Sequence, residues 1–381
     1  MDKKILQLIN SYAPAFKFGG ANRIMFDYAK LLVDSGYEVT VFTTDVKDEK
    51  SKLSTAEKNL FSSWINITYF NNWSTYLTSR FNSSISPHLW LSVLRRAHLY
   101  DYVHISGFRG ILPLLVLIVM RLNKKRLVHS GFGMLSSRSG KRHIRILNDC
   151  YDFFITKPLI NRIDVALCEN SNEALQYRKY GYKGKLVIIP NPVISPTKAS
   201  ISKPIKINST YINLLFLGRI HPSKGIINAI KLTEKLNNYK RQFRLTIIGN
   251  DEGDLNNLVS YVNKRELQDL VRFSPPVYGD DRFFLYASAD AYVILPTQNL
   301  ETSVASIEAL SADTIVLFNN NSFIEFAHEE EAGINIDKFS DIESIVSILL
   351  NAKYRGNAQK FFEKYFSTEK IKKILVSEVF E

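Results

Sequence analysis

Two cations five positions apart follow an apolar run in the segment FLGRIHPSKG, residues 216–225. The apolar run predicts a strand that ends at Gly218, and a helical pattern begins just after Lys224. Arg219 would then emerge at the carboxyl edge of a sheet, with Lys224 just before the next helix. A planar guanidinium and an ammonium group at one sheet edge suit a diphosphate. The same spacing also fits a solvated pair of cations on a loop.

A second segment, NLETSVASIEALSAD at residues 299–313, joins a polar loop to a helical pattern. Glu301 lies in the loop and Glu308 in the helix. Backbone N–H groups near Ser303 and Val304 would face an anion, and the Glu308 carboxylate could accept both hydroxyls of a ribose. A capped amphipathic helix with an ordinary acid would show the same pattern.

Adjacent glycines, Gly19 and Gly20, precede a helical pattern that begins near Ala21. Without side chains they would let the backbone approach a ligand closely, and the free N–H groups at the helix start favour an anion. The spacing is not that of the dinucleotide-binding fingerprint. An ordinary strand-to-helix turn remains an alternative.

These residues would be positioned by alternating strands and helices. A strand at 3–12, a helix at 21–36 and a strand at 37–45 form a βαβ unit, which predicts a parallel sheet. After a proline-containing connection at residues 189–209 the alternation restarts after residue 210. There we expect strands at 211–220, 243–250, 271–275, 291–297 and 314–320, and helices at 223–238, 254–267, 281–289 and 303–313. Two doubly wound domains would place their ligands at the carboxyl ends of the strands, in a cleft between them.

Length and composition agree with two folded domains. The chain has 381 residues, of which 45% are apolar, so long disordered regions are excluded as its main feature. Cys150 and Cys168 are too few for a disulfide framework or a four-thiolate zinc site and suggest a reducing compartment. The longest apolar run, residues 111–120, is half the roughly 20 residues that span a bilayer. We expect it to be a buried helix.

The net charge of +12 lies entirely in the first half of the chain. Residues 1–190 carry 27 basic and 14 acidic side chains, and residues 191–381 carry 22 and 23. No helix-turn-helix, zinc finger or stacking sheet accompanies the basic residues, so we expect no nucleic-acid partner. They predict a patch for an anionic membrane or acceptor, with a spread over solvated faces as the alternative. The patch comprises Lys124, Lys125, Arg126, Lys141 and Arg142.

Taken in order, the segments resemble the retaining glycosyltransferases of family 4, which have the GT-B fold. The similar segments are GYEVTVFT, DYVHISGF, GRIHPSKG, ASADAYVILPT, IEALSADTIVLF and YFSTEKI. The resemblance implies an α/β fold of two Rossmann-like doubly wound domains facing a central cleft, with a C-terminal helix that returns to the first domain. It predicts an acceptor domain at 1–190, a linker at 191–212, a donor domain at 213–362 and a crossover helix at 363–381.

The resemblance also implies roles for the residues above. Arg219 and Lys224 would hold the diphosphate of a nucleotide-sugar, helped by backbone N–H groups of Ser303 and Val304, and Glu308 would bind the ribose. Gly19 and Gly20 would close on the distal phosphate and the sugar. The family needs neither a metal nor another cofactor, and the sequence contains no cluster with ligand spacing.

Two departures from the family pattern define the candidate catalytic residues, His129 and Glu301. The family has seven residues between its two glutamates, whereas Glu301 and Glu308 have six between them. Either the loop is one residue shorter or Glu301 has a different role. Phe132 stands where the family has a histidine, and His129, three residues upstream, could reach a sugar hydroxyl instead or be purely structural.

The resemblance predicts a hexosyltransferase-type enzyme that moves one sugar to a glycan or polyprenyl-diphosphate-linked acceptor and retains the anomeric configuration. We expect it in the synthesis of bacterial surface polysaccharide, such as lipopolysaccharide O-antigen or capsule, in the cytoplasm or on the inner face of the membrane. A catalytically silent nucleotide-sugar-binding homologue and a sugar-nucleotide 2-epimerase of the same architecture remain alternatives.

Overall fold

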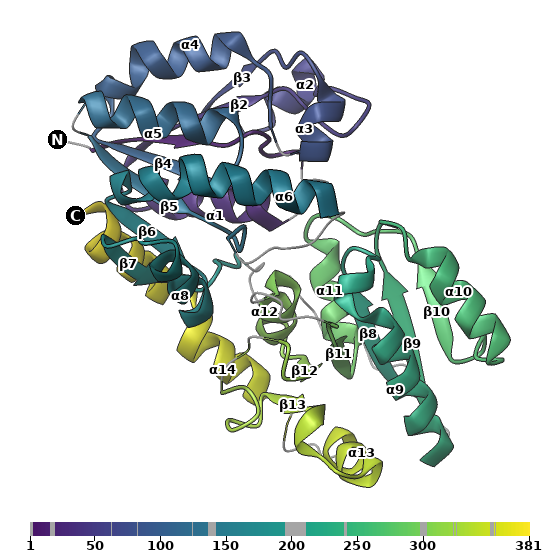
Figure 1. Ribbon diagram of the computed structural model, residues 1–381. Helices are drawn as coiled ribbons and strands as arrows, with labels where there is room; N and C mark the ends of the chain where they lie inside the picture. The colour runs from purple at the N-terminus through teal and green to yellow at the C-terminus, as the bar shows by residue number, and fades with distance from the viewer. Residues whose placement is uncertain are drawn as a thin grey trace. The chain divides into compact units, whose positions relative to one another are not determined.

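In the computed structural model, the chain folds into two compact units (Figure 1). Unit 1 is Met1–Pro192 together with Thr368–Glu381, and unit 2 is Val193–Ser367. The structure describes residues 3–15, 20–61, 63–81, 83–123, 125–135, 142–194, 211–239, 242–297, 303–322, 324, 326–350, 354 and 356–381.

Unit 1 is built on a seven-stranded parallel sheet with the order β3-β2-β1-β4-β5-β6-β7. The strands are β1 (Lys4–Leu8), β2 (Glu38–Thr44), β3 (Asn66–Phe70), β4 (Tyr102–Ser106), β5 (Arg126–Ser130), β6 (Val165–Cys168) and β7 (Lys185–Ile188). The central strands are buried nearly throughout, as expected for a parallel sheet that is covered on both faces. The predicted βαβ opening is confirmed by β1, α1 (Gly20–Val33) and β2.

The remaining helices of unit 1 lie mainly in the connections between its strands. They are α2 (Thr55–Lys58), α3 (Thr75–Phe81), α4 (Pro87–Arg96), η2 (Ala97–Leu99), α5 (Ile111–Asn123), α6 (Arg142–Tyr151), the π-helical η3 (Asp152–Thr156), α7 (Lys157–Leu159), η4 (Ile160–Arg162) and α8 (Ser171–Lys179). Helix α5 contains the apolar run of the sequence. Its face with Leu112 and Val116 is buried, but Ile111 and Ile118 are exposed. The expectation of a buried helix therefore holds for one face only.

The C-terminal segment returns to unit 1, as the resemblance implied. It consists of α15 (Thr368–Ile374) and the π-helical η8 (Leu375–Phe380). Lys3 Nζ donates to the carbonyl oxygen of Phe380 at 3.2 Å, and the Phe380 ring packs edge-on against Tyr102 with their centroids 5.2 Å apart. This segment therefore completes the core of unit 1.

Unit 2 has a six-stranded parallel sheet with the order β10-β9-β8-β11-β12-β13. Its strands are β8 (Ile212–Leu217), β9 (Phe243–Ile248), β10 (Val271–Ser274), β11 (Ala291–Ile294), β12 (Ile315–Phe318) and β13 (Gly333–Asn335). Its helices are η5 (Pro222–Lys224), α9 (Ile226–Tyr239), α10 (Leu255–Lys264), α11 (Asp281–Ser288), α12 (Val304–Ser311), η6 (Ile336–Lys338), α13 (Ile342–Leu350) and α14 (Asn357–Phe366). The strands and helices predicted after residue 210 are confirmed within a few residues.

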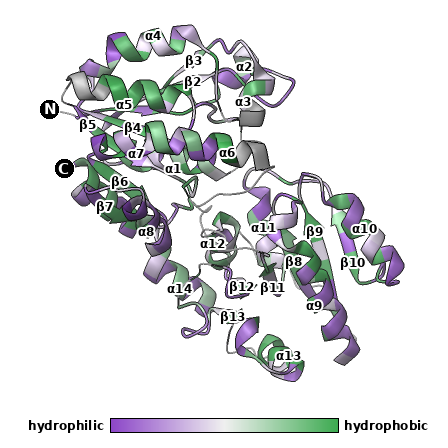
Figure 2. Ribbon diagram, viewed as in Figure 1, coloured by the Kyte–Doolittle hydropathy of each residue, from purple (hydrophilic) through white to green (hydrophobic). Residues whose placement is uncertain are grey.

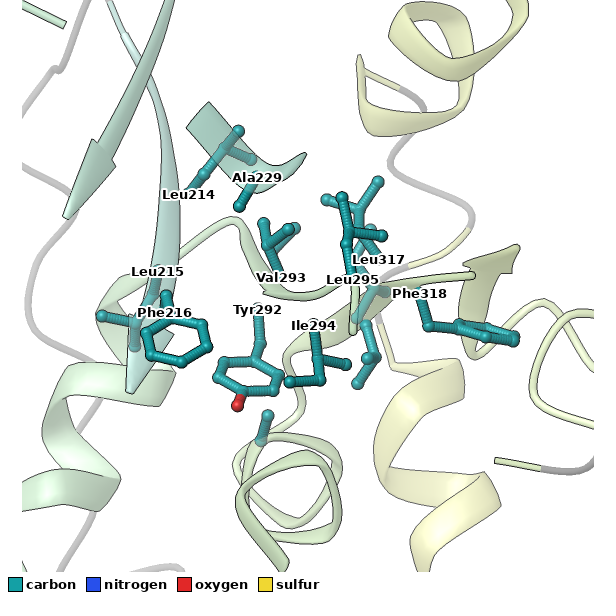
Figure 3. Packing of buried hydrophobic residues seen from close by; sticks show 14 of the residues in the cluster. Leu214, Leu215, Phe216, Ala229, Tyr292, Val293, Ile294, Leu295, Leu317 and Phe318 are labelled. Carbon is teal, nitrogen blue, oxygen red and sulfur yellow. The ribbon is translucent and has the colours of Figure 1, made fainter. Parts of the chain in front are cut away.

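The core of unit 2 follows the twofold alternation of its strands. Figure 3 shows Val293 on the same side of β11 as Ala229 of α9, whereas Tyr292 and Ile294 point to the opposite side. All four side chains are buried. The sheet is thus packed on both faces.

Candidate functional site

The loop after β8 carries Arg219 at the carboxyl edge of the unit 2 sheet. Backbone bonds extend the pairing with the loop after β9: the N–H of Ile220 donates to Asn250 O at 2.8 Å, and the N–H of Glu252 donates to Ile220 O at 2.9 Å. The Arg219 side chain is 51% exposed, and its Nη1 lies 2.7 Å from Oε2 of Glu252. The structure therefore holds this cation at the predicted edge, next to a carboxylate.

Lys224 lies at the end of η5, and the glycine after it fixes the position of this loop. Gly225 has φ +65°, and a Cβ atom at this position would lie 1.8 Å from the carbonyl oxygen of Leu295, just after β11. Nδ2 of Asn228 donates to the same oxygen at 3.0 Å. Only glycine permits this approach, which brings the Lys224 loop to the end of β11.

The start of α12 is connected to the same edge through Tyr292. Ser303 is the N-cap residue, and its side chain interacts with the Tyr292 phenol in the direction that lowers its pKa. The Tyr292 hydroxyl donates to Leu217 O at 3.2 Å, two residues before Arg219. Burial of this hydroxyl raises its pKa well above the usual value. The predicted donor residues Arg219, Lys224, Ser303 and Val304 therefore come from loops that converge on one sheet edge.

Glu308, the predicted ribose ligand, is buried one turn into α12 and faces α11. Its Oε1 accepts from Nε of Arg282 at 2.9 Å and from Nη2 at 2.8 Å. Its Oε2 accepts from the Tyr286 hydroxyl at 3.1 Å. Arg282 and Tyr286 were not predicted as site residues. Their spacing of four on one helix signals a shared face, but nothing in the sequence shows that Glu308 lies opposite that face.

In unit 1, His129 lies at the end of β5 with both ring nitrogens in hydrogen bonds. Nδ1 is 2.7 Å from the Tyr177 hydroxyl and Nε2 is 3.0 Å from the carbonyl oxygen of Gly107. Because a carbonyl only accepts, Nε2 carries the proton and Nδ1 accepts from Tyr177. Burial lowers the pKa of His129 to about 4, so the ring is neutral at pH 7. As a catalytic residue it would have to exchange one of these bonds for a substrate.

The loop after β5 places Phe132 in a strained conformation with φ +46°. The carboxylate of Glu173 holds this loop: Oε1 accepts from the N–H of Gly133 at 2.9 Å, and Oε2 accepts from the N–H of Glu169 at 2.7 Å. Glu173 was not predicted as a site residue. The pattern Asn170-x-x-Glu173 is a helix-start signal that could have drawn attention to it, since Asn170 is the N-cap residue of α8.

The other predicted residues are less defined. Gly20 opens α1 and is exposed. In the predicted membrane patch, Arg126 is exposed at the start of β5, Lys125 is half-buried and Arg142 begins α6. Four predicted residues lie outside the described residues, namely Gly19, Lys124, Lys141 and Glu301.

The described residues hold neither a metal-ion cluster nor a membrane-spanning helix. No three of their His, Cys, Asp and Glu side chains form a group that could hold a metal ion. Within the same part of the chain, every helix is too short or too polar to cross a bilayer.

Comparison with known proteins agrees with the fold. HepE from Anabaena, solved in complex with UDP, is 17% identical, covers 98% of both chains and superposes with a TM-score of 0.72. Sucrose-phosphate synthase from Thermosynechococcus elongatus is 16% identical over 98% of this chain and 97% of its own, with a TM-score of 0.70. A glycosyltransferase from Rickettsia africae is 16% identical over the same shares, with a TM-score of 0.66. No curated protein matches the sequence.

Two family models match successive parts of the chain. Residues 18–194 match Glycosyltransferase Family 4, and residues 197–363 match Glycosyl transferases group 1. The structural neighbours have the GT-B fold over the full chain, as the sequence predicted. The chain is a glycosyltransferase of the GT-B fold and belongs to family 4, the group 1 glycosyltransferases.

Proposed function

We propose that this enzyme transfers one sugar, a hexose, from a nucleoside-diphosphate donor to a lipid-linked acceptor, with retention of the anomeric configuration. The observation that carries the proposal is the sheet edge of unit 2, where Arg219, Lys224 and the start of α12 converge. HepE was solved with UDP and with UDP-glucose, which supports a donor of this chemical class.

At this edge, a diphosphate would replace Glu252 as the partner of Arg219. The Arg219–Glu252 pair is largely exposed, so it is worth about 0–1 kcal/mol. A group with two or more negative charges competes well for such a cation, and Arg219 can bind it through two parallel hydrogen bonds. Lys224 and the N–H groups of Ser303 and Val304 would further stabilise the negative charge of the diphosphate. The exposed pair therefore keeps Arg219 in place without blocking the site.

Catalysis would then consist of positioning and of stabilising the charge that develops on the departing diphosphate. We propose that Glu308 binds the ribose while Arg282 and Tyr286 fix its orientation, and that Gly19 and Gly20 approach the distal phosphate and sugar. His129 and Glu301 remain the proposed catalytic residues. The proposed reaction uses no metal and no other cofactor, as the family resemblance implies.

For the acceptor, we propose a glycan carried on a polyprenyl diphosphate, in the synthesis of bacterial surface polysaccharide at the cytoplasmic face of the membrane. The charge of residues 1–190, 27 basic against 14 acidic side chains, supports an anionic partner for unit 1. The predicted patch of Lys124, Lys125, Arg126, Lys141 and Arg142 would contribute to this attraction. Each cation that reaches an anionic surface adds about 1 kcal/mol.

The donor is tested by calorimetric titration of the full chain with UDP-glucose and other nucleoside-diphosphate sugars. Arg219→Ala and Lys224→Ala should each weaken binding of the best donor at least tenfold. Arg265→Ala is the matched control, because Arg265 is 53% exposed and ion-paired with Glu234 away from this edge. Unchanged donor affinity in both test variants would show that the diphosphate binds elsewhere.

A further inference from the structure

Four large apolar side chains are exposed along α6 and η3. Ile146 and Leu147 are 54% and 67% exposed, and Phe153 and Phe154 are 63% and 72% exposed. Residues seven and eight positions apart lie on one side of a helix, so the two pairs share one face, called here the 146–154 stripe, with exposed Asp149 and Cys150 on the turn between them. The two phenyl rings contact each other edge-on, with their centroids 5.0 Å apart. Figure 2 shows green, hydrophobic stretches along α6.

Hydrogen bonds and an ion pair on the buried side of η3 hold it against the rest of unit 1. Asp152, in the first position of the π-helical turn, is buried and accepts from Nε of Arg109 at 3.1 Å and from Nη2 at 2.6 Å. The hydroxyls of Tyr180 and Thr156 donate to the same carboxylate at 2.9 Å each. Because Asp152 and Thr156 are the inward residues of η3, Phe153 and Phe154 face outward. The exposed rings therefore belong to a well-supported helix.

An exposed apolar stripe of this kind marks an interaction surface, because water-exposed phenyl rings are costly. Charge indicates the partner. Arg138, Lys141, Arg142 and Arg145 precede the stripe in the sequence and exposed Lys157 follows it, whereas Asp149 is the one acid among residues 138–151. Apolar residues beside a cluster of cations are typical of helices that lie in the interface of an anionic bilayer. A second copy of the chain would bring its own cations against these.

We propose that α6 and η3 dock the enzyme on an anionic lipid bilayer, with the 146–154 stripe inserted among the lipid headgroups. The proposal deepens the proposed function and rests on it for the membrane location of the acceptor. It assigns the apolar contact to residues outside the basic patch predicted from the sequence. The lipid would thus be bound by inserted apolar side chains as well as by charge.

Co-sedimentation of the full chain with vesicles tests the docking. The vesicles contain phosphatidylcholine alone or equal parts of phosphatidylcholine and phosphatidylglycerol. The variant Phe153→Ser with Phe154→Ser should lower the partition onto the mixed vesicles at least tenfold, since burying even one phenyl side chain supplies that factor. Leu175→Ser is the matched control, because Leu175 is 58% exposed on α8. Thermal unfolding checks that every variant is folded.

Three results would overturn the docking proposal. The wild-type chain could fail to bind the mixed vesicles, or the double variant could bind as the wild type does. Alternatively, light scattering could show a wild-type dimer that the double variant abolishes while vesicle binding is unchanged, which would assign the stripe to a second copy. The double variant should bind the nucleotide-sugar as the wild type does. Arg219→Ala should lose donor binding and keep normal vesicle binding, because Arg219 lies in unit 2. Donor binding therefore tests the proposed function and vesicle binding tests the docking, so the failure of one can be told from the failure of the other.

Discussion

Arg282 donates from two guanidinium nitrogens to a single oxygen of Glu308, at 2.9 and 2.8 Å, and both side chains are largely buried. The two charges come from α11 and α12, so the pair fixes the position of α12 relative to its neighbour. Removing one partner would leave the other charge buried without compensation. The residue predicted to bind ribose is thus also part of the internal structure of unit 2.

Arg282→Met should lower the free energy of unfolding by about 3–5 kcal/mol, because it leaves the Glu308 carboxylate buried and unpaired. Adding Glu308→Leu should recover much of that loss, since a well-packed apolar pair replaces a buried ion pair at little cost. Urea unfolding of both single variants and the double variant measures the coupling. Additive losses would mean that the two side chains do not stabilise each other.

Gly225→Ala should destabilise unit 2 far more than Gly279→Ala. Both glycines have left-handed backbone conformations, at φ +65° and +71°, but only the Cβ at 225 meets a carbonyl oxygen, at 1.8 Å. Gly279→Ala should cost about 1 kcal/mol for the backbone alone. Gly225→Ala must also displace the Lys224 loop, so its donor affinity should fall as well. Equal unfolding midpoints in the two variants would contradict the close approach.

Glu252→Gln should lower the KM for the donor by up to about fivefold. The substitution removes a competitor for the Arg219 guanidinium, and an exposed pair is worth no more than about 1 kcal/mol. Steady-state kinetics with varied donor concentration measures the change. Glu234→Gln, which breaks the ion pair with Arg265, is the control and should leave the KM unchanged. A raised KM in Glu252→Gln would mean that Glu252 helps Arg219 to bind the donor.

Stability should decrease as the pH falls below 6.5. Burial lowers the pKa of His129 to about 4 and that of His104 to about 3, from 6.5. Between pH 6.5 and 4 the unfolded chain binds protons that the folded chain excludes, so each ring costs about 1.4 kcal/mol per pH unit in this window. Above pH 6.5 neither state is protonated and the full stability is present.

Urea midpoints at pH 7.5, 6.0 and 5.0 measure this dependence. His129→Asn should reduce the slope by removing one of the two buried rings, although it also lowers stability at every pH. His98→Asn, at an exposed histidine, should keep the wild-type slope. A slope that is identical in His129→Asn and the wild type would show that His129 takes up its proton as readily when folded.

Alternating patterns are sufficient to predict the elements that position the proposed donor site. The run at 211–220 contains β8, and the segment at 303–313 contains α12. The helix expected at 223–238 begins at Ile226, because Pro222–Lys224 form a short 3-10 turn and Gly225 turns the chain against Leu295. That boundary depends on the contact of Gly225 with Leu295, just after β11. The hydrophobic pattern of residues 223–238 carries no information about this contact.

The partners of the site residues could not be predicted for the same reason. Glu308 meets Arg282, 26 positions earlier in the sequence, and His129 meets Tyr177, 48 positions later. Each bond forms where two helices or a helix and a strand pack together. The type and spacing of Arg219 and Lys224 indicated a diphosphate site, but the neighbouring carboxylate of Glu252 follows from the pairing of two loops.

The return of the C-terminal segment to unit 1 affects the order in which the protein can fold. Phe380 is fully buried against Tyr102 and next to His104. Strands β1 to β7 are synthesised long before residues 368–380, so during translation the surface that Phe380 covers stays exposed until the whole of unit 2 has been made. Unit 2 is continuous in sequence and can complete its core first. Unit 1 can therefore reach its native state only after the whole chain has been made, although its synthesis begins first.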